Sequence, residues 1–250
     1  MELAEAVVAV TGGTGGLGSQ ICRAFGRAGA RVAVIYLERQ AQASALATEL
    51  LAGGAAGSLA VQADVTQVGP ISGMVERVLE EWGRLDVLVN NAAFNQYVAY
   101  SDLDGMTQEL WQKLLHCNVT GPFLCSKAVA PVMKRQGSGR IVNIGSTAGF
   151  SPGGSSIAYA VSKAALAHLT RCLAVAFAPE VLVNGVAPGL MEGTRMTARL
   201  HPDQVRRASE EAALGRPVDK DDVADQVVTF ARTDSTTGQN VIIDSGRVFH

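Results

Sequence analysis

The sequence has little net charge, no basic amino terminus and no long apolar run. Its 21 Lys and Arg residues nearly balance 23 Asp and Glu residues, for a formal net charge of -2. It therefore lacks the positive charge that nucleic acids and anionic membranes attract, and we expect neither as a partner. Glu2 and Glu5 stand where a secretory signal is basic, and no uninterrupted apolar stretch approaches the ~18 residues of a membrane span. These absences predict a soluble, cytoplasmic protein that binds a small molecule or a cofactor.

Cysteine and histidine are also scarce. The cysteines lie in predicted helices without CxxC spacing: Cys22, Cys117, Cys125 and Cys172. We expect them to be buried, reduced thiols. The histidines are scattered, with no companion ligand at metal spacing: His116, His168, His201 and His250. The sequence therefore predicts no metal site.

The 48% of hydrophobic residues is enough for a substantial core, and the apolar pattern alternates between short β-branched runs and longer helical segments. The predicted strands are residues 6–10, 31–36, 58–62, 87–90, 140–144, 182–186 and 240–244. Intervening helices are predicted at residues 16–28, 40–51 and 71–82, among others. This rhythm is typical of βαβ units, and nearly continuous apolar strands indicate a parallel α/β sheet with helices on both faces.

No linker interrupts this alternation, so we expect one catalytic domain over residues 1–250. From 189 to 217 the pattern loosens into a long connection with Gly193, Pro202 and Gly215. Long connections in compact α/β domains are often binding loops, and we interpret this one as a substrate loop.

The first strand leads directly into Thr11-Gly-Gly-Thr-Gly-Gly-Leu-Gly18 and then into a helix. In this position Gly12 permits a tight turn, Gly16 a close approach of phosphate, and Gly18 close helix packing. Backbone N–H groups at the start of the helix would face a pyrophosphate. A purely structural turn is the alternative, but the position after the first strand favours a dinucleotide site.

The end of the second strand should meet the adenosine ribose, where an acid favours NAD and a basic residue favours NADP. The strand ends at Tyr36, which supplies neither charge, and Glu38 and Arg39 follow with opposite implications. We favour NADP because Arg39 could reach a 2′-phosphate. NAD remains the alternative, as does a solvated Glu38–Arg39 loop pair.

Ser146 follows a predicted strand, and Tyr159 and Lys163 lie one turn apart on a predicted helix. A carbonyl or alcohol oxygen could contact Ser146 and Tyr159 together. We expect the nearby charge of Lys163 to lower the pKa of Tyr159, so that Tyr159 acts as general acid or base. Ser146 would donate a hydrogen bond to the reacting oxygen. These residues predict hydride transfer between a secondary alcohol or ketone and a nicotinamide cofactor.

Together these motifs resemble the classical short-chain dehydrogenase/reductase family, including 3-oxoacyl reductase-like and alcohol dehydrogenase-like members. The resemblance covers essentially the whole chain and includes Asn90-Asn91-Ala92 after the fourth strand. It implies a Rossmann-type, doubly wound, seven-stranded sheet and a homotetramer or homodimer. It also adds Asn118 to the catalytic residues, as the group that holds a water linked to the lysine.

The resemblance further implies contacts with adenine, with the nicotinamide ribose and with the carboxamide. The complete cofactor set is Gly12, Thr14, Gly16, Leu17, Gly18, Tyr36, Arg39, Asp64, Val65, Asn91, Ala92, Tyr159, Lys163, Pro188, Gly189 and Thr194. One departure from the family pattern is Ala93 in place of glycine, for which we expect a small local shift.

The predicted substrate is a small carbonyl or alcohol compound, bordered by residues 94–100, 150–157 and 190–200. Met191 and Met196 are candidate lining residues, and Arg195 or Arg199 could bind a substrate anion. A 3-oxoacyl thioester reductase is an alternative, although the absence of basic residues at Pro131 and at 178–180 disfavours a carrier-protein substrate. A non-catalytic dinucleotide sensor is the alternative of another class, which the presence of both Tyr159 and Lys163 disfavours.

Overall fold

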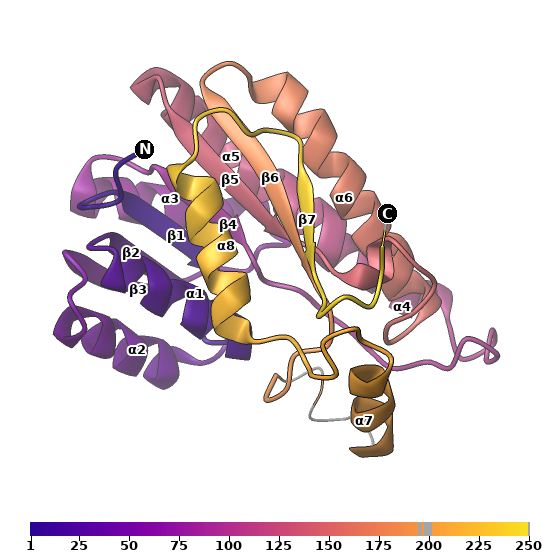
Figure 1. Ribbon diagram of the computed structural model, residues 1–250. Coiled ribbons are helices and arrows are strands. Elements are labelled where there is room, and N and C mark those ends of the chain that lie inside the picture. The colour runs from indigo at the N-terminus through magenta and orange to yellow at the C-terminus, as the bar shows by residue number, and fades with distance from the viewer. Residues whose placement is uncertain (195–196, 198–201, 250) are drawn as a thin grey trace.

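The computed structural model describes residues 1–194, 197 and 202–249. Its strands form one parallel sheet in the order β3-β2-β1-β4-β5-β6-β7 (Figure 1). The strands are β1 (Val7–Thr11), β2 (Arg31–Tyr36), β3 (Gly57–Gln62), β4 (Val87–Asn90), β5 (Gly139–Ile144), β6 (Val181–Pro188) and β7 (Asn240–Ile243). This is the predicted Rossmann-type sheet, with all seven strands within a few residues of their expected positions.

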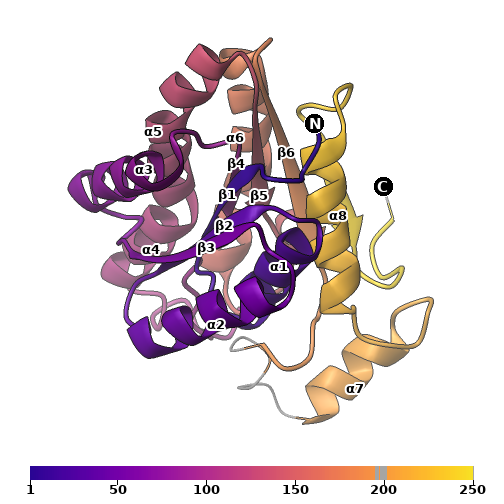
Figure 2. The ribbon, with the colours of Figure 1, turned by 90° about the vertical axis from the view of Figure 1, so that its left-hand side faces the viewer.

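Helices cover both faces of the sheet, as predicted. They are α1 (Gly16–Arg27), α2 (Gln40–Ala52), α3 (Val68–Trp82), α4 (Gln108–Leu115), α5 (Gly121–Gln136), α6 (Ile157–Phe177), α7 (Pro202–Glu210) and α8 (Lys220–Arg232). Short helices are η1 (His116–Thr120), a π-helix, and η2 (Thr147–Gly149), a 3₁₀-helix. Figure 2 shows α1, α2 and α8 on one side of the sheet and α3, α5 and α6 on the other.

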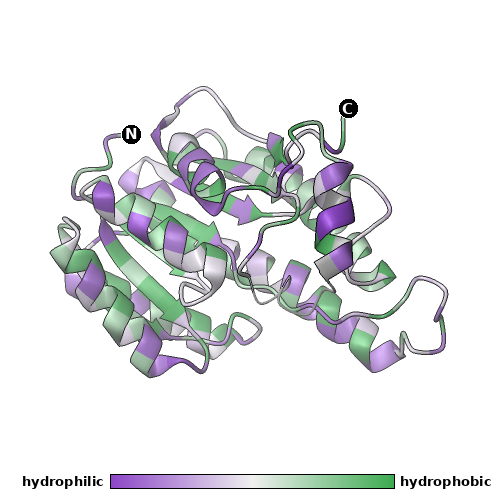
Figure 3. Ribbon diagram, turned by 60° about the horizontal axis from the view of Figure 1, so that its bottom comes forward, coloured by the Kyte–Doolittle hydropathy of each residue, from purple (hydrophilic) through white to green (hydrophobic). Residues whose placement is uncertain are grey.

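Successive side chains of the buried strands point to opposite faces of the sheet and so contribute to two separate parts of the core. Val8 and Val10 of β1 point into a cluster with Phe25 of α1, whereas Val7 and Ala9 point into a cluster on the opposite face. Figure 3 shows the apolar strands between helices that carry their polar residues outward. Because both strand faces are covered, each strand reads as a nearly unbroken apolar run.

The order of the strands indicates where a ligand would bind. After β3 the chain crosses to the other side of β1 and adds β4, so the winding direction reverses between β1 and β4. In such open parallel sheets, ligands bind beyond the carboxyl ends of the strands at this reversal. The carboxyl ends of β1, β4, β5 and β6 carry Gly12, Asn91, Gly145 and Gly189, which lead into the predicted motifs.

Several local expectations need correction. The connection 189–217 contains the helix α7, which its proline and glycine content concealed. Helix α3 begins at Val68, since Pro70 is tolerated in a first turn that needs no N–H donor. The four cysteines are free, but Cys172 is exposed and Cys117 is partly exposed, so the expectation of uniformly buried thiols is wrong.

Helix α6 is long and apolar enough to span a membrane by length and composition alone. Among the described residues it is the one helix with this property. It packs beside the sheet, however, and buries Tyr159, Lys163, Leu166 and Leu173. Its apolar character therefore belongs to a core helix of the α/β fold.

Candidate active site

The glycine turn after β1 is locked by its neighbours. Gly12 has a φ of 61°, a backbone conformation that favours glycine. The side-chain amide of Asn91 donates to the carbonyl oxygens of Thr11 and Gly12, at 2.9 and 3.1 Å. A Cβ atom at Gly18 would overlap the carbonyl oxygen of Gly12 and would lie 2.7 Å from Nδ2 of Asn91. The close packing of this turn therefore requires glycine at these positions.

Helix α1 begins directly after this turn, and its amino-terminal end is suited to binding a phosphate group. Gly15 is its N-cap, and no side chain among the described residues caps the helix. The first turn contains Gly16, Leu17 and Gly18, whose backbone N–H groups carry the positive end of the helix dipole. The donors and their charge fit the pyrophosphate of a dinucleotide, and Gly16, Leu17 and Gly18 would hold it there.

The connection after β6 approaches the same turn. A Cβ atom at Gly16 would lie 3.0 Å from the carbonyl oxygen of Gly193 and 3.3 Å from Cα of Thr194. Pro188 ends β6, and the N–H of Gly189 donates to Ile243 at 2.8 Å, which anchors the start of the connection. The predicted residues Gly189 and Thr194 thus belong to a segment that covers the glycine turn. Arg195, Met196 and Arg199, also considered from the sequence, lie outside the described residues.

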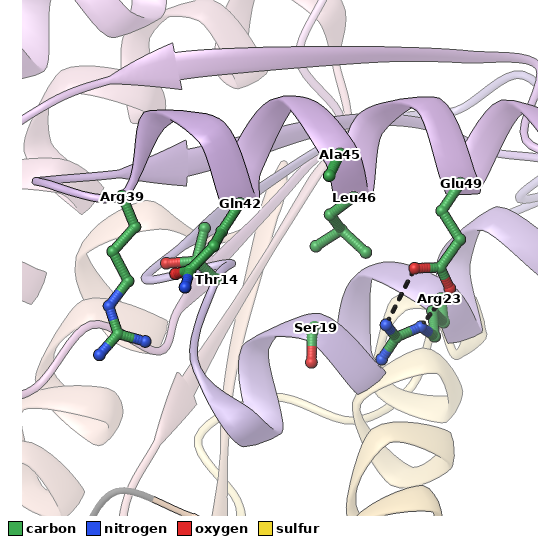
Figure 4. A pocket seen from close by; sticks show the side chains of 8 residues that line it. All are labelled: Thr14, Ser19, Arg23, Arg39, Gln42, Ala45, Leu46 and Glu49. Atoms are coloured by element: carbon green, nitrogen blue, oxygen red, sulfur yellow. Dashed lines mark hydrogen bonds and ion pairs between the residues drawn. The ribbon is translucent and has the colours of Figure 1, made fainter.

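A hollow of about 330 Å³ lies between α1 and α2 (Figure 4). Its lining residues are Thr14, Ser19, Arg23, Arg39, Gln42, Ala45, Leu46 and Glu49. The figure shows Arg39 near Thr14 and Gln42, with the Arg23–Glu49 ion pair at the other end. Arg39 is the N-cap residue of α2 and is exposed, so its guanidinium is available for an anion. Tyr36, by contrast, is buried at the end of β2.

Sequence reasoning missed most of this hollow. Ser19 and Arg23 are four residues apart on α1, and Gln42 and Glu49 are seven apart on α2, so each pair shares one helix face. That spacing was a signal that polar side chains face each other between the two helices. It could not show that Arg23 is paired with Glu49, through contacts of 2.6 and 3.0 Å.

Asp64 and Val65 follow the carboxyl end of β3, and Ala92 follows that of β4. Asp64 follows β3, and its Oδ1 accepts hydrogen bonds from the N–H and hydroxyl of Thr66, at 2.9 and 2.7 Å. Ala92 donates its N–H to the Thr11 hydroxyl at 3.0 Å, which joins the ends of β1 and β4. Ala93 is exposed, so its extra methyl group has room.

Ser146, Tyr159 and Lys163 come together at the end of β5 and the start of α6. Ser146 is the N-cap of η2, and its Oγ accepts from the N–H of Ala148 at 3.2 Å. Ser156 caps α6 by accepting from the N–H of Tyr159 at 3.2 Å. The side chain of Ser146 lies close enough to the hydroxyl of Tyr159 to lower its pKa. Caps at the two helix starts thus fix the predicted serine and tyrosine beside each other.

The expected effect of Lys163 on Tyr159 is wrong for this arrangement. Burial raises the pKa of Tyr159 to about 12, and the nearby side chain of Ser146 opposes that rise only in part. Burial lowers the pKa of Lys163 to about 8. The Lys163 amino group donates to the carbonyl oxygen of Ile144 at 2.8 Å and lies 5.7 Å from the centre of the tyrosine ring. Desolvation therefore outweighs the attraction that the sequence suggested.

Asn118 lies in the π-helix η1 and ties three segments together. Its Oδ1 accepts from the N–H of Phe94 at 2.8 Å, and its Nδ2 donates to the carbonyl of Phe94 at 2.9 Å. Nδ2 also donates to the hydroxyl of Ser162 at 3.0 Å. The side-chain amide is thus used to position the loop after β4 against the catalytic helix. The water link inferred for this residue stays a prediction.

Two of the three segments expected to border the substrate meet directly. Val98 donates its N–H to the carbonyl of Ser155 at 2.9 Å. The hydroxyl of Tyr100 donates to the carbonyl of Gly153 at 2.6 Å and accepts from its N–H at 2.9 Å. These contacts close residues 94–100 onto residues 150–157, beside Tyr159.

Tyr159 belongs to a small apolar cluster of the core. Its members are Leu114, Ala148, Ala158 and Tyr159, with Phe94, Met106, Leu110, Trp111 and Ala160 packed against them. Lys113 adds its amino group 4.4 Å above the ring of Phe94. The residues from α4 were not anticipated, although the spacing of Leu110 and Leu114 on one helix face was a signal for them.

Residues 6–205 match the family described as short chain dehydrogenase. The chain belongs to the short-chain dehydrogenase family. The 3-oxoacyl-[acyl-carrier-protein] reductase of Synechocystis is 35% identical over 251 residues, which cover 98% of both chains. Two solved structures each have a TM-score of 0.88 and cover 98% of this chain. The Pseudomonas aeruginosa RhlG/NADP active-site complex is 32% identical, with 97% of its chain covered. The NADPH-dependent 3-quinuclidinone reductase of Rhodotorula rubra is 27% identical, with 92% covered.

As a member of this family, the protein is an NAD(P)-dependent oxidoreductase that acts on CH–OH groups. The expected family and enzyme class are thus confirmed. The short-chain dehydrogenase fold explains why residues that are far apart in the sequence meet beyond the carboxyl ends of the strands. The roles of the individual site residues stay predictions that rest on the geometry described above.

Proposed function

We propose that this short-chain dehydrogenase reduces the ketone of a small, largely apolar compound to a secondary alcohol, with NADP as the preferred coenzyme. The observation that carries the proposal is the buried side chain of Tyr159, which lies beside Ser146 and belongs to a small apolar cluster. A single catalytic domain over residues 1–250 performs the reaction.

Tyr159 is the proton donor in the proposed reaction. Its raised pKa keeps the hydroxyl protonated at neutral pH, which suits donation to an oxygen that gains negative charge. Ser146 donates a hydrogen bond to the same oxygen and holds it in place. The nicotinamide cofactor, when bound, supplies the hydride for reduction or accepts it in the reverse direction.

Lys163 and Asn118 support this proton transfer. Lys163 lies one helix turn beyond Tyr159, and its amino group has the reach to bind the ribose hydroxyls of the cofactor. Burial lowers the pKa of its amino group to about 8, so this group can release a proton close to neutral pH. Asn118 holds Phe94 and Ser162, and Ser162 in turn donates to the carbonyl of Tyr159 at 2.7 Å. Asn118 therefore acts as a positioning residue for the catalytic helix.

Two observations support NADP. Arg39 is exposed at the edge of a hollow next to the ribose position, together with Thr14. Among the similar structures, the RhlG complex contains NADP. Arg39 would bind the 2′-phosphate as a charged donor. NAD remains the alternative, with Glu38 as the ribose contact.

A 3-oxoacyl thioester is the second candidate substrate. It is favoured by the 35% identity to a protein named 3-oxoacyl-[acyl-carrier-protein] reductase. Against a carrier protein stands the exposed Pro131 on α5, where a basic residue would be expected. If the substrate is a 3-oxoacyl thioester, we therefore favour a free thioester with a short carrier-like arm over a thioester attached to the carrier protein.

We also propose a cytoplasmic homotetramer or homodimer. The outer faces of α5 and α6 expose Phe123, Val161 and Val175, the last with 82% of its surface accessible. A second copy of this chain would cover these apolar side chains. The four free cysteines agree with a reducing compartment. Light scattering of the purified protein measures the oligomeric state directly.

The proposed function is tested with the unsubstituted protein and Tyr159→Phe. We expect the unsubstituted protein to bind NADPH at least about tenfold more tightly than NADH, a difference of about 1.4 kcal/mol. It should oxidise NADPH in the presence of cyclic or acyl ketones, and of N-acetylcysteamine thioesters of 3-oxo acids if the second candidate holds.

Tyr159→Phe should bind NADPH as before and lose about 10²- to 10⁴-fold in turnover. Equal turnover by the two proteins would contradict the role of Tyr159. Coenzyme binding without turnover of any ketone by the unsubstituted protein would favour a dinucleotide sensor. Tighter binding of NADH would contradict the preference for NADP.

A further inference from the structure

The side chain of Lys220 lies beside the segment that covers the glycine turn. Lys220 is the first residue of α8, directly after the N-cap Asp219. Its Nζ is so close to Gly193 that a Cβ atom there would lie 3.1 Å from it. Gly193 has a φ of 67° and in turn lies against Gly16 of α1. Lys220 is therefore a neighbour of Gly193, which is itself a neighbour of Gly16 at the start of α1.

A second contact places the start of α8 beside α1. The hydrogen bond with Glu49 is the main cause that raises the pKa of Arg23, and the charge of Asp221 adds to it. Phe25 of α1 and Val227 of α8 belong to the same core cluster. Figure 2 shows the two helices side by side. Helices α1 and α8 thus pack against each other, and the first turn of α8 lies near enough to α1 for the charge of Asp221 to act on Arg23.

The amino group of Lys220 has no ion pair or hydrogen bond within the described part of the chain. Its nearest acids in sequence do not use it: Oδ1 of Asp219 accepts the N–H of Asp221 at 2.9 Å and caps the helix. Asp221 and Asp222 are exposed, so water screens their charges. A half-buried lysine without a partner, next to a glycine-lined anion site, is available for a ligand.

We propose that Lys220 binds the pyrophosphate of the cofactor beside Gly193 and thereby helps to hold Gly193 and Thr194 against the glycine turn. The inference rests on the proposed position of the pyrophosphate at the start of α1. That helix end offers roughly half a positive charge, whereas the pyrophosphate carries two negative ones. An ammonium group supplies the missing charge, and Gly193 lets it approach because it has no side chain.

This role differs from that of Arg39. Arg39 would recognise a phosphate that NADPH has and NADH lacks. Lys220 would recognise the pyrophosphate, which NADPH, NADH and ADP-ribose share. The two residues therefore predict different patterns of lost affinity.

The test compares dissociation constants for NADPH, NADH and ADP-ribose, measured by fluorescence or calorimetric titration. The variants are Lys220→Met, which keeps the aliphatic stem, and Lys220→Arg, which keeps the charge. Arg27→Met is the control, because it removes an exposed positive charge from the opposite end of α1. Thermal unfolding of each variant without ligand confirms that it is folded.

We expect Lys220→Met to weaken all three ligands by a similar factor of about five to ten. Lys220→Arg should stay within about twofold of the unsubstituted protein, and Arg27→Met should bind normally. The difference between Lys220→Met and the unsubstituted protein should shrink as the salt concentration rises, because a charge contact is screened.

Equal affinities of the unsubstituted protein and Lys220→Met would overturn this inference alone. A loss confined to NADPH would assign Lys220 to the 2′-phosphate and overturn the pyrophosphate contact. A loss that Lys220→Arg shares, with no dependence on salt, would mean that Lys220 acts by packing, which also overturns it. Failure of the unsubstituted protein to bind any of the three ligands would overturn the proposed function as well.

Discussion

Lys163 and Ile144 are joined by a hydrogen bond of 2.8 Å, from the lysine amino group to the main-chain carbonyl at the end of β5. The lysine is one helix turn beyond Tyr159, and both side chains are only 3% exposed. Burial moves their pKa values in opposite directions, to about 8 for Lys163 and about 12 for Tyr159. At neutral pH the hydroxyl of Tyr159 therefore keeps its proton, whereas the amino group of Lys163 begins to lose its proton about one pH unit higher.

The lowered pKa of Lys163 makes the stability of the protein depend on pH. Below pH 8 both the folded and the unfolded chain hold the proton, and burying the charged amine costs its full amount. Between pH 8 and about 10.5 the unfolded chain binds the proton more tightly, so stability rises with pH. We expect the unfolding free energy of the protein to gain up to about 3 kcal/mol relative to Lys163→Met over this range.

Urea denaturation of both proteins at pH 7, 8, 9 and 10 measures this difference. Because Tyr159 is present in both, its own titration largely cancels in the comparison. Parallel curves for the two proteins would show that the amine titrates alike in the folded and unfolded chains, against the prediction.

The raised pKa of Tyr159 should separate the two directions of catalysis. Ketone reduction needs the protonated hydroxyl, which predominates across the neutral range, so kcat/KM should vary little between pH 6 and 9. Alcohol oxidation needs the deprotonated form, and its kcat/KM should rise about tenfold per pH unit over the same range. Initial rates with one ketone–alcohol pair in both directions provide the measurement. An oxidation rate that is independent of pH would count against Tyr159 as the base.

The sheet and the motifs could be predicted from the sequence because they depend on local patterns. The apolar strands, the glycine turn at Gly12 to Gly18 and the one-turn spacing of Tyr159 and Lys163 are all visible in short segments. The partner of Lys163 is not, because it depends on where the end of β5 lies. The pKa of Tyr159 also depends on burial by residues distant in sequence. The contacts of Gly193 with Lys220 and with Gly16 bring together segments about 200 residues apart, and no periodicity indicates them.

Two glycines at different sites should respond in opposite ways to the same added methyl group. Gly18→Ala would push a Cβ atom into the carbonyl of Gly12, so we expect a loss of about 1–3 kcal/mol in stability and no measurable NADPH binding. Gly73→Ala is the matched control in α3, where no atom lies within 4 Å of the new Cβ. It should gain about 0.5–1 kcal/mol, since alanine favours the helix.

Chemical denaturation and NADPH titration of both variants separate the two effects. Normal coenzyme binding by Gly18→Ala would mean that the turn adapts to a side chain and is not the tightly fitted cradle described above. A destabilised Gly73→Ala would instead point to an unrecognised contact on the outer face of α3.

The preference for NADP should depend on Arg39, because it is the exposed guanidinium at the ribose end of the hollow between α1 and α2. Removing it in Arg39→Ala should weaken NADPH about tenfold or more and leave NADH nearly unchanged, as expected for a charge-assisted contact to one phosphate. Glu38→Ala is the matched control from the same loop. It should tighten NADPH slightly by removing a negative charge near the phosphate, while a marked loss of NADH affinity would reveal Glu38 as the ribose contact. If Arg39→Ala weakened both coenzymes equally, the guanidinium would be acting on the fold of the hollow and not on the 2′-phosphate, and the coenzyme preference would need another origin.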